Sequence, residues 1–266
     1  HHYVKGTEIN LSRHVRGICV KRGPLLLLIA LVFIVLGAGA FLFLNDDADG
    51  IQEPDDLVGL LTEAGDNIRA AETFRMEIRQ EGIAYRFLTD LGDGAVEVGF
   101  RRSIGQYVAP NEIQLDVSVT LGSLTTSVLT YGRGLEQWYR LPVFGWIKED
   151  FAAGFDPETL IAEDTGFQAA LEALIDIEYD GAVNIDGTTA YKLRGSADGT
   201  EVADLLVGLI EDEGEVDVEV YINVETRYPI RITIIQKETD SDDPMTWLID
   251  LYDINAPRDI DLPPEL

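Results

Sequence analysis

The sequence predicts an α+β fold, in which a highly curved antiparallel β-sheet is covered by a few helices and preceded by one N-terminal transmembrane helix. Ten or eleven segments of the 266-residue chain have the pattern of a strand, whereas two or three show helical periodicity. The strands follow one another at hairpin-like spacing without strict β-α-β alternation, which favours antiparallel pairing. A long apolar segment near the start of the chain is typical of a membrane span.

Residues 23–44 form this apolar segment. They carry no charge, and about 20 helical residues are enough to span the hydrocarbon core of a bilayer. Residues 1–22 are basic and residues 45–53 form an acidic linker. Because Lys and Arg accumulate on the cytoplasmic side, we expect residues 1–22 in the cytoplasm and residues 54–266 outside it. A cleaved signal peptide is the alternative, since Ala38-Gly39-Ala40 resembles a cleavage site, although the apolar run continues beyond it.

The net charge of −28 is unevenly distributed along the chain. Residues 1–44 carry five Lys or Arg and one Glu, a net charge of +4, which leaves −32 on residues 45–266. Nucleic-acid binding needs clustered basic residues to contact phosphates, so the acidic part excludes that function. The same charge disfavours tight adhesion to anionic lipid headgroups, and any bound lipid is therefore expected inside the fold.

The chain has a single cysteine, Cys19, and its histidines are His1, His2 and His14. Residues 45–266 lack both residue types, which excludes Ser-His-Asp and Cys-His catalysis and the common zinc sites there. Residues 45–50 match the first half of a calcium loop, but Pro54 interrupts the loop and its twelfth position is Asp instead of Glu. We interpret this segment as a solvated linker and predict no cofactor, no metal and no enzymatic activity.

Three segments of the exported part show helical patterns. The first begins at Pro54 and places its apolar residues on one face as far as Ala71. The second, residues 157–174, begins with Asp156 as N-cap and proline at the first helical position, and Thr165-Gly166 is a potential break in it. The third, residues 200–210, is a short amphipathic helix.

Alternation predicts the strands, most strongly at residues 113–121, where five apolar residues alternate with four polar ones. The other predicted strands are residues 74–78, 96–100, 124–131, 135–139, 175–181, 189–195, 216–222, 230–234 and 245–254. Residues 141–146 form an aromatic-rich turn, Asp186-Gly187 is a hairpin turn, and the chain from Asn255 onward is extended. A two-sheet sandwich is the alternative, but the amphipathic helices also need an apolar surface, which one curved sheet provides.

The order of these elements, and several short strings within it, resemble a known protein family. The strings are Tyr131-Gly132 with Gln137-Trp138-Tyr139, Phe155-Asp156-Pro157, Asp186-Gly187 with Tyr191–Gly195, Val218–Asn223 with Thr226 and Pro229–Ile232, and Tyr252–Pro257 with Pro263. Together they resemble the LppX/LprAFG-type envelope lipoproteins within the wider LolA/LolB-like superfamily. The resemblance covers most of residues 55–266.

This resemblance implies a half-barrel in a prokaryotic cell envelope that encloses an apolar cavity and carries lipids. It brings no catalytic motif. The chain departs from the family in its anchor, because those proteins are usually held by a lipidated cysteine, whereas Cys19 lies on the cytoplasmic side of the apolar segment. A tethered carrier would hand over lipid near the membrane, or sense it.

Candidate site residues follow from the apolar faces of the predicted strands and helices. The lipid-cavity candidates are Phe74, Met76, Ile78, Val96, Val98, Phe100, Leu115, Val117, Val119, Leu121, Leu160, Leu171, Leu205 and Leu209. The cavity-mouth candidates are Phe144 and Trp146 of the aromatic-rich turn and Trp138 of the predicted strand before it. The same apolar residues could instead fill a packed core, and the aromatic turn could be a buried plug.

The function predicted from these features is lipid binding and transfer by a membrane-anchored, extracytoplasmic domain. The expected partners are a lipid or lipid-like apolar ligand and the membrane itself, through residues 23–44. The alternative is an accessory or scaffold subunit of a membrane protein complex, in which the half-barrel is a docking domain. Residues 37–40, which lie within the apolar segment, are small and suit close helix packing in such a complex.

Overall fold

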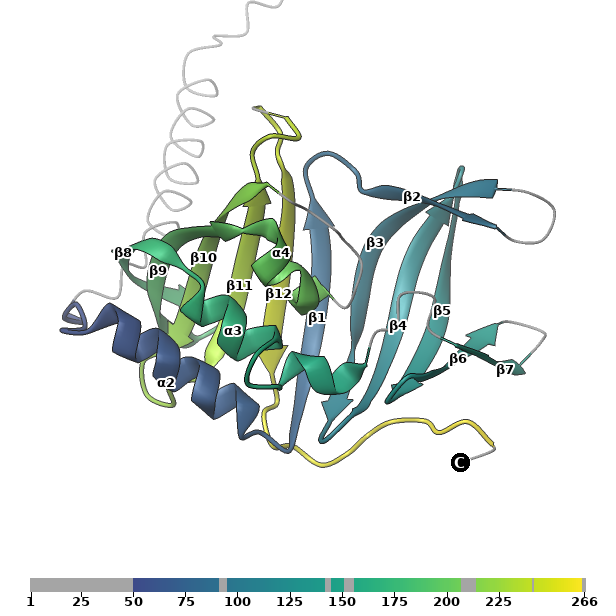
Figure 1. Ribbon diagram of the computed structural model, residues 1–266, viewed down its shortest axis with the longest axis horizontal. Helices are drawn as coiled ribbons and strands as arrows, with labels where there is room; N and C mark the ends of the chain where they lie inside the picture. Colours follow the sequence, from purple (N-terminus) through teal and green to yellow (C-terminus); the bar gives the residue numbers. More distant parts are fainter. Residues whose placement is uncertain are drawn as a thin grey trace, which may run out of the picture. The chain divides into compact units, whose positions relative to one another are not determined.

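Twelve strands form one open, curved antiparallel sheet in the computed structural model, which describes residues 50–90, 95–141, 145–150, 156–206, 214–240 and 242–264 (Figure 1). The strands are β1 (Thr73–Glu81), β2 (Arg86–Asp90), β3 (Ala95–Val108), β4 (Glu112–Leu121), β5 (Leu124–Arg133), β6 (Glu136–Leu141), β7 (Gly145–Asp150), β8 (Ile175–Ile185), β9 (Thr188–Asp198), β10 (Glu215–Asn223), β11 (Pro229–Gln236) and β12 (Met245–Tyr252). Their order is β7-β6-β5-β4-β3-β1-β12-β11-β10-β9-β8, and β2 pairs with β3 off this path. The prediction of a curved antiparallel sheet is confirmed.

Two meanders make up this sheet, β1–β7 and β8–β12, and they join where β1 pairs with β12. Met76 lies opposite Leu251 and Ile78 opposite Ile249 at this join. In an antiparallel pair, residues directly opposite each other share a face, so these four apolar side chains lie on one face of the sheet. All four are buried. The centre of the sheet is therefore formed by its first and its last strand.

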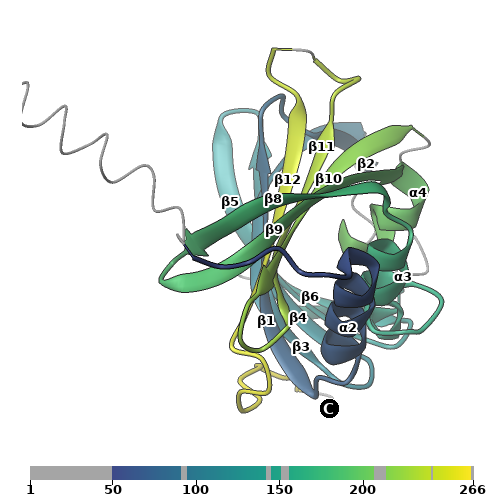
Figure 2. The same cartoon turned by 90° about the vertical axis from the view of Figure 1, so that its left-hand side faces the viewer.

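Helices cover one face of this sheet, the concave one, as Figures 1 and 2 show. They are α2 (Leu57–Arg69), α3 (Gly166–Glu172), α4 (Gly199–Val202) and two 3₁₀ turns, η1 (Pro157–Leu160) and η2 (Ala203–Leu206). Helix α2 begins where the Asp56 side chain accepts a hydrogen bond from the backbone N–H of Gly59, at 2.8 Å. Its apolar face, which includes Leu61 and Ile68, packs toward the sheet and toward α3.

The predicted helix 157–174 is divided into η1 and α3. Asp156 caps η1 as expected, accepting a hydrogen bond from the backbone N–H of Glu158. Gly166 then takes a φ of +64°, and a side chain there would overlap the carbonyl oxygens of Thr159 and Leu160. Glycine is the residue that tolerates this conformation, so the turn between η1 and α3 depends on it.

Two strands were absent from the sequence prediction. β2 is a five-residue strand whose one described neighbour is β3, and its sequence is too short for a clear alternation. β7 occupies residues 145–150, so the predicted turn at 141–146 ends earlier than expected. Half of the residues of β7 are charged, so its sequence lacks the apolar alternation that would predict a strand paired with β6.

The predicted transmembrane segment, residues 23–44, lies outside the described residues, as do most of the acidic linker and residues 207–210 of the third predicted helix. Among the residues that the structure describes, no helix is both long enough and apolar enough to cross a membrane.

Candidate functional site

The concave face of the sheet has a region that helices cover. Here the apolar side chains of β1 and β9–β12 pack against α2, α3 and η2 and form the core. Phe74 stacks on Tyr107, with 4.8 Å between ring centroids, and meets Phe167 of α3 edge-on at 5.8 Å. Met76 and Ile232 in the same region are inaccessible to solvent. This half of the concave face is a packed core.

A second region of the concave face lies on β4 and β5, beside the covered one (Figure 1). Its residues lie directly opposite one another on the two strands, at every second position, so their side chains share the concave face. They are Val117, Val119, Leu121, Leu124 and Val128, together with Thr126, which lies opposite Val119, and we call them the β4–β5 apolar region. Val117 packs against the core, whereas Val119, Leu121 and Val128 are half-buried and Leu124 is exposed. The apolar surface thus continues outward from the packed core.

The predicted cavity residues fall into three groups in the structure. The buried ones are Phe74, Met76, Ile78, Val98, Phe100, Leu115, Leu160, Leu171 and Leu205. Val117, Val119 and Leu121 are partly exposed, and Val96, at the start of β3, is 36% exposed. Leu209 lies outside the described residues. The prediction did not include the β5 members of the apolar region, because Thr and Ser interrupt the apolar alternation of that strand.

Two of the predicted mouth residues lie on the opposite, convex face. Trp138 of β6 is paired with Tyr131, which is paired with Gln114, so all three point away from the concave neighbour Leu115. Trp146 of β7 is on the same side, with the Arg140 guanidinium 5.5 Å from its ring centroid. The sequence Gln137-Trp138-Tyr139 does not reveal which side chain points inward, because each of the three can occupy either face. Phe144 lies outside the described residues.

The C-terminal segment, residues 254–264, extends across the sheet end from β1 to β6 (Figure 1). Two buried glutamines hold it, each through both atoms of its amide. Gln106 donates to the carbonyl oxygen of Pro257, at 3.2 Å, and accepts from the backbone N–H of Asp259, at 2.7 Å. Gln114 makes the same pair of bonds with the backbone of Asp261, at 2.5 and 2.9 Å. These side chains replace a neighbouring strand as partners for the extended tail.

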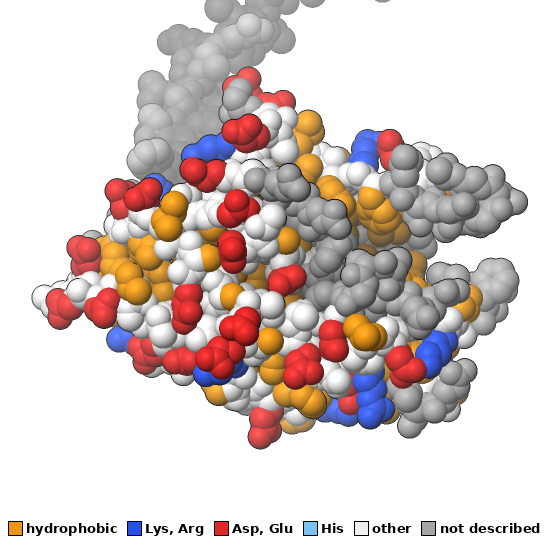
Figure 3. Space-filling view, in the orientation of Figure 1, with side chains coloured by type: hydrophobic (Ala, Val, Ile, Leu, Met, Phe, Trp, Pro, Cys, Tyr) orange, Lys and Arg blue, Asp and Glu red, His pale blue; other side chains and the backbone are white. Residues whose placement is uncertain are grey.

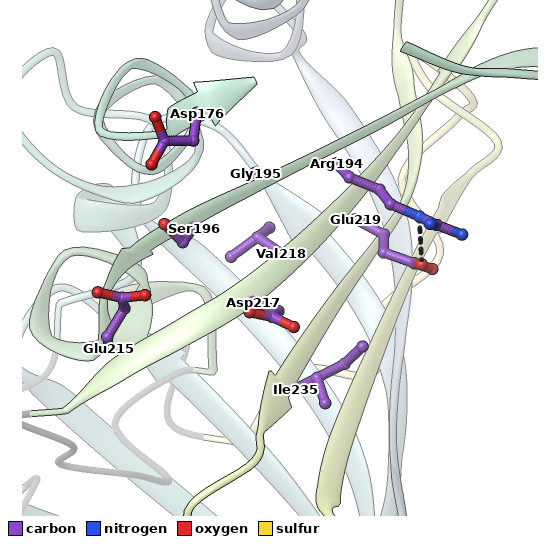
Figure 4. A pocket seen from close by; sticks show the side chains of 9 residues that line it. All are labelled: Asp176, Arg194, Gly195, Ser196, Glu215, Asp217, Val218, Glu219 and Ile235. Atoms are coloured by element: carbon purple, nitrogen blue, oxygen red, sulfur yellow. Dashed lines mark ion pairs between the residues drawn. The ribbon is translucent and has the colours of Figure 1, made fainter. Parts of the chain in front are cut away.

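The convex face also has a charged hollow of about 400 Å³ over β8–β11 (Figure 4). Carboxylates from these strands line it, and the Arg194–Glu219 ion pair closes one side. Lys192 forms a second ion pair with Glu219, at 2.9 Å. This lining suits neither an apolar ligand nor an anion. No cluster of three or more metal-ligating side chains occurs among the described residues.

Glu219 should make stability depend on pH. Burial raises its pKa, but hydrogen bonds from Lys192 and Tyr221 outweigh burial and hold the pKa below its ordinary value of 4.5. A lowered pKa stabilises the fold above the unfolded-state pKa, and this contribution is lost as the pH falls through the folded-state value. We expect Glu219→Gln to lower the free energy of unfolding at pH 7 by about 1 kcal/mol and to flatten its decline below pH 4.5.

Urea denaturation at several pH values measures both effects of Glu219→Gln. Glu215→Gln, at an exposed carboxylate on the same strand, is the control, and an equal effect of both variants would contradict the assignment.

The structure defines a class of protein: an open antiparallel half-barrel whose concave face is apolar, partly packed under helices and partly accessible. Residues 110–260 match the LppX_LprAFG lipoprotein family, and because this is more than half of the chain, the protein belongs to that family. No curated protein matches the chain in sequence.

The solved structures that share the fold include two mycobacterial lipoproteins. LprF from Mycobacterium bovis has a TM-score of 0.57 and 14% identity, over 78% of this chain and 96% of that protein. The Mycobacterium tuberculosis lipoprotein LppX has a TM-score of 0.52 and 16% identity, over 77% of this chain and 98% of that protein. The resemblance inferred from the sequence is thus confirmed at the level of family and fold.

Proposed function

We propose that residues 54–266 form an extracytoplasmic lipid-binding domain that holds acyl chains against the β4–β5 apolar region. Membership of a lipoprotein family and the half-barrel fold support this function. The observation that carries it is the division of the concave face. The apolar side chains under the helices are packed against protein. Those of the β4–β5 apolar region are partly exposed and are continuous with the core.

The energy of binding would come from removing apolar surface from water, at roughly 25 cal/mol per Å². The half-buried Val119 and Leu121 and an acyl chain laid along them would both lose contact with solvent. The domain needs no catalytic residue for this task, and we propose that it is not an enzyme.

In this proposal residues 1–22 are cytoplasmic, residues 23–44 anchor the protein in the membrane, and residues 45–53 link the anchor to the domain. The anchor limits the domain to lipid transfer or lipid sensing close to the membrane. A soluble carrier could cross the whole envelope, but a tethered one works within the reach of its linker.

Lipid extraction tests the proposal directly. Residues 47–266, which form one compact unit, would be produced without the anchor, purified and extracted for lipid mass spectrometry. We expect acyl-chain lipids at a defined ratio to protein. A protein that contains no lipid and does not take up a fluorescent fatty acid would contradict the proposal and favour a docking subunit.

A pair of neighbouring substitutions locates the binding surface. Val119→Asp places a charge on the concave face beside the bound chain, and we expect the affinity for a fluorescent fatty acid to fall about tenfold or more, because burying an unpaired charge is costly. Ser118→Asp is the control, since Ser118, the residue before Val119 on β4, points to the convex face and lies opposite Arg102. Equal affinities of the two variants, with thermal unfolding unchanged, would place the ligand elsewhere.

A further inference from the structure

The β4–β5 hairpin has no charged residue over 16 consecutive positions, from Val117 to Gly132. Asp116 and Arg133 bound this stretch on either side. It stands in a domain whose net charge is strongly negative and whose helical face is covered with acidic side chains (Figure 3). The uncharged hairpin therefore contrasts with the acidic surface of the described helices.

The two sides of the hairpin are chemically different. Its concave side is the β4–β5 apolar region, which ends at the tip with Leu121 opposite Leu124. Its convex side carries hydroxyl groups, among them Ser118 and Ser127, whose Oγ atoms are 3.1 Å apart. The hairpin is thus an amphipathic sheet segment without charge.

The tip of the hairpin projects into open space. Leu124 is 62% exposed, and Gly122, at a φ of +61°, has no heavy atom within 4 Å of the position that a side chain would take. Strand β6 pairs with β5 from Leu129 to Arg133. Within the part of the chain that the structure describes, the outer edge of residues 124–128 has no partner strand.

We propose that the tip of this hairpin, residues 121–124, is the point at which the domain contacts an uncharged lipid surface. Leucine side chains enter the boundary between headgroups and acyl chains readily, whereas carboxylates are repelled by anionic headgroups and are costly to desolvate. Contact is shallow, because the free backbone groups of residues 124–128 need water or headgroup partners and cannot enter hydrocarbon.

This inference rests on the proposed function, because the same hairpin forms the wall of the proposed binding surface. Leu121 and Leu124 at the tip are followed along the concave side by Val119 and then by Val117, which reaches the core. An acyl chain that leaves the bilayer at the tip meets an apolar path without crossing a charged side chain of this hairpin.

The test uses the full chain in vesicles, with a fluorescent probe on the hairpin. Cys19→Ser removes the native thiol and Ser123→Cys provides one at the tip for an environment-sensitive dye. In phosphatidylcholine vesicles we expect blue-shifted emission and quenching by a lipid-attached quencher. Leu124→Asp should weaken this quenching about tenfold, because burial of a leucine favours the apolar phase by roughly that factor. Leu135→Asp, at the 61% exposed leucine beyond the other end of β5, should leave it unchanged.

Each outcome decides the inference. Weaker quenching when phosphatidylglycerol is added supports it, because the acidic domain is then repelled from the surface. A dye that stays exposed to water in pure lipid vesicles overturns it, and so does protection seen only in native membranes, which would indicate a protein strand at the free edge. If the wild type still takes up a fluorescent fatty acid while its tip stays exposed, the membrane contact alone fails. If it takes up none, the proposed function fails.

Discussion

Replacing Trp247 with alanine is expected to lower the free energy of unfolding by about 3–5 kcal/mol, the usual cost of truncating a large buried aromatic side chain. Trp247 lies on β12 and is fully inaccessible to solvent. Its ring centroid is 5.3 Å from that of Tyr85 and 5.5 Å from that of Phe100, so it connects β12 with β3 and the segment before β2. Its indole N–H donates to the Gln236 side chain at 3.0 Å inside the core.

Trp146→Ala is the matched control for Trp247→Ala. Trp146 is half-buried on the convex face of β7, and its contact with Arg140 is an exposed cation–π interaction, worth about 0.5–1 kcal/mol. Urea denaturation followed by far-ultraviolet circular dichroism compares the two, since both substitutions alter tryptophan fluorescence. Equal losses of stability would contradict the view that the packed half of the concave face is the core of the domain.

Removal of residues 255–266 is expected to destabilise the sheet unevenly. The tail makes four hydrogen bonds with Gln106 and Gln114 and an ion pair between Arg75 and Asp259, at 2.8 Å. Because a hydrogen bond contributes about 1 kcal/mol net to stability, losing the four bonds between the tail and the two glutamines should cost about 3 kcal/mol or more. The effect should be largest in β1 and β3–β6, which the tail crosses, and small in β9–β11.

Hydrogen exchange measured strand by strand would reveal this difference. A chain that lacks only residues 265–266 is the control, because it keeps every contact named for the tail. Faster exchange spread evenly over all twelve strands would show that the tail stabilises the domain in some other way.

Local patterning was enough to predict most strands, because each has one buried face and its apolar residues therefore alternate. The prediction failed where that condition fails. β2 has five residues, and β7 is half charged, so neither contains a usable alternation. The facing of β6 was also unpredictable, because Gln137 and Trp138 are both buried, one on each face of the sheet.

The candidate site was predictable only as a set of inward-facing residues. The sequence placed Val117, Val119 and Leu121 on the same face as Leu115, as the structure does. Which part of that face helices would cover depends on long-range packing, which no local pattern reports. The docking of the tail is similar, since an extended segment was expected but its glutamine partners lie about 150 positions away along the chain.

The pairing of β1 with β12 has a consequence for how the domain folds. Met76 and Leu251 are 175 positions apart along the chain, yet they are direct neighbours in the sheet. Contacts between residues so distant in sequence make folding slow, because a long stretch of chain must be ordered before they can form. β3–β7 can pair with one another early, but β1 keeps an open edge until residues 245–252 have been synthesised. The sheet is therefore completed late in folding. Until β12 pairs with it, the open edge of β1 needs protection from pairing with other chains.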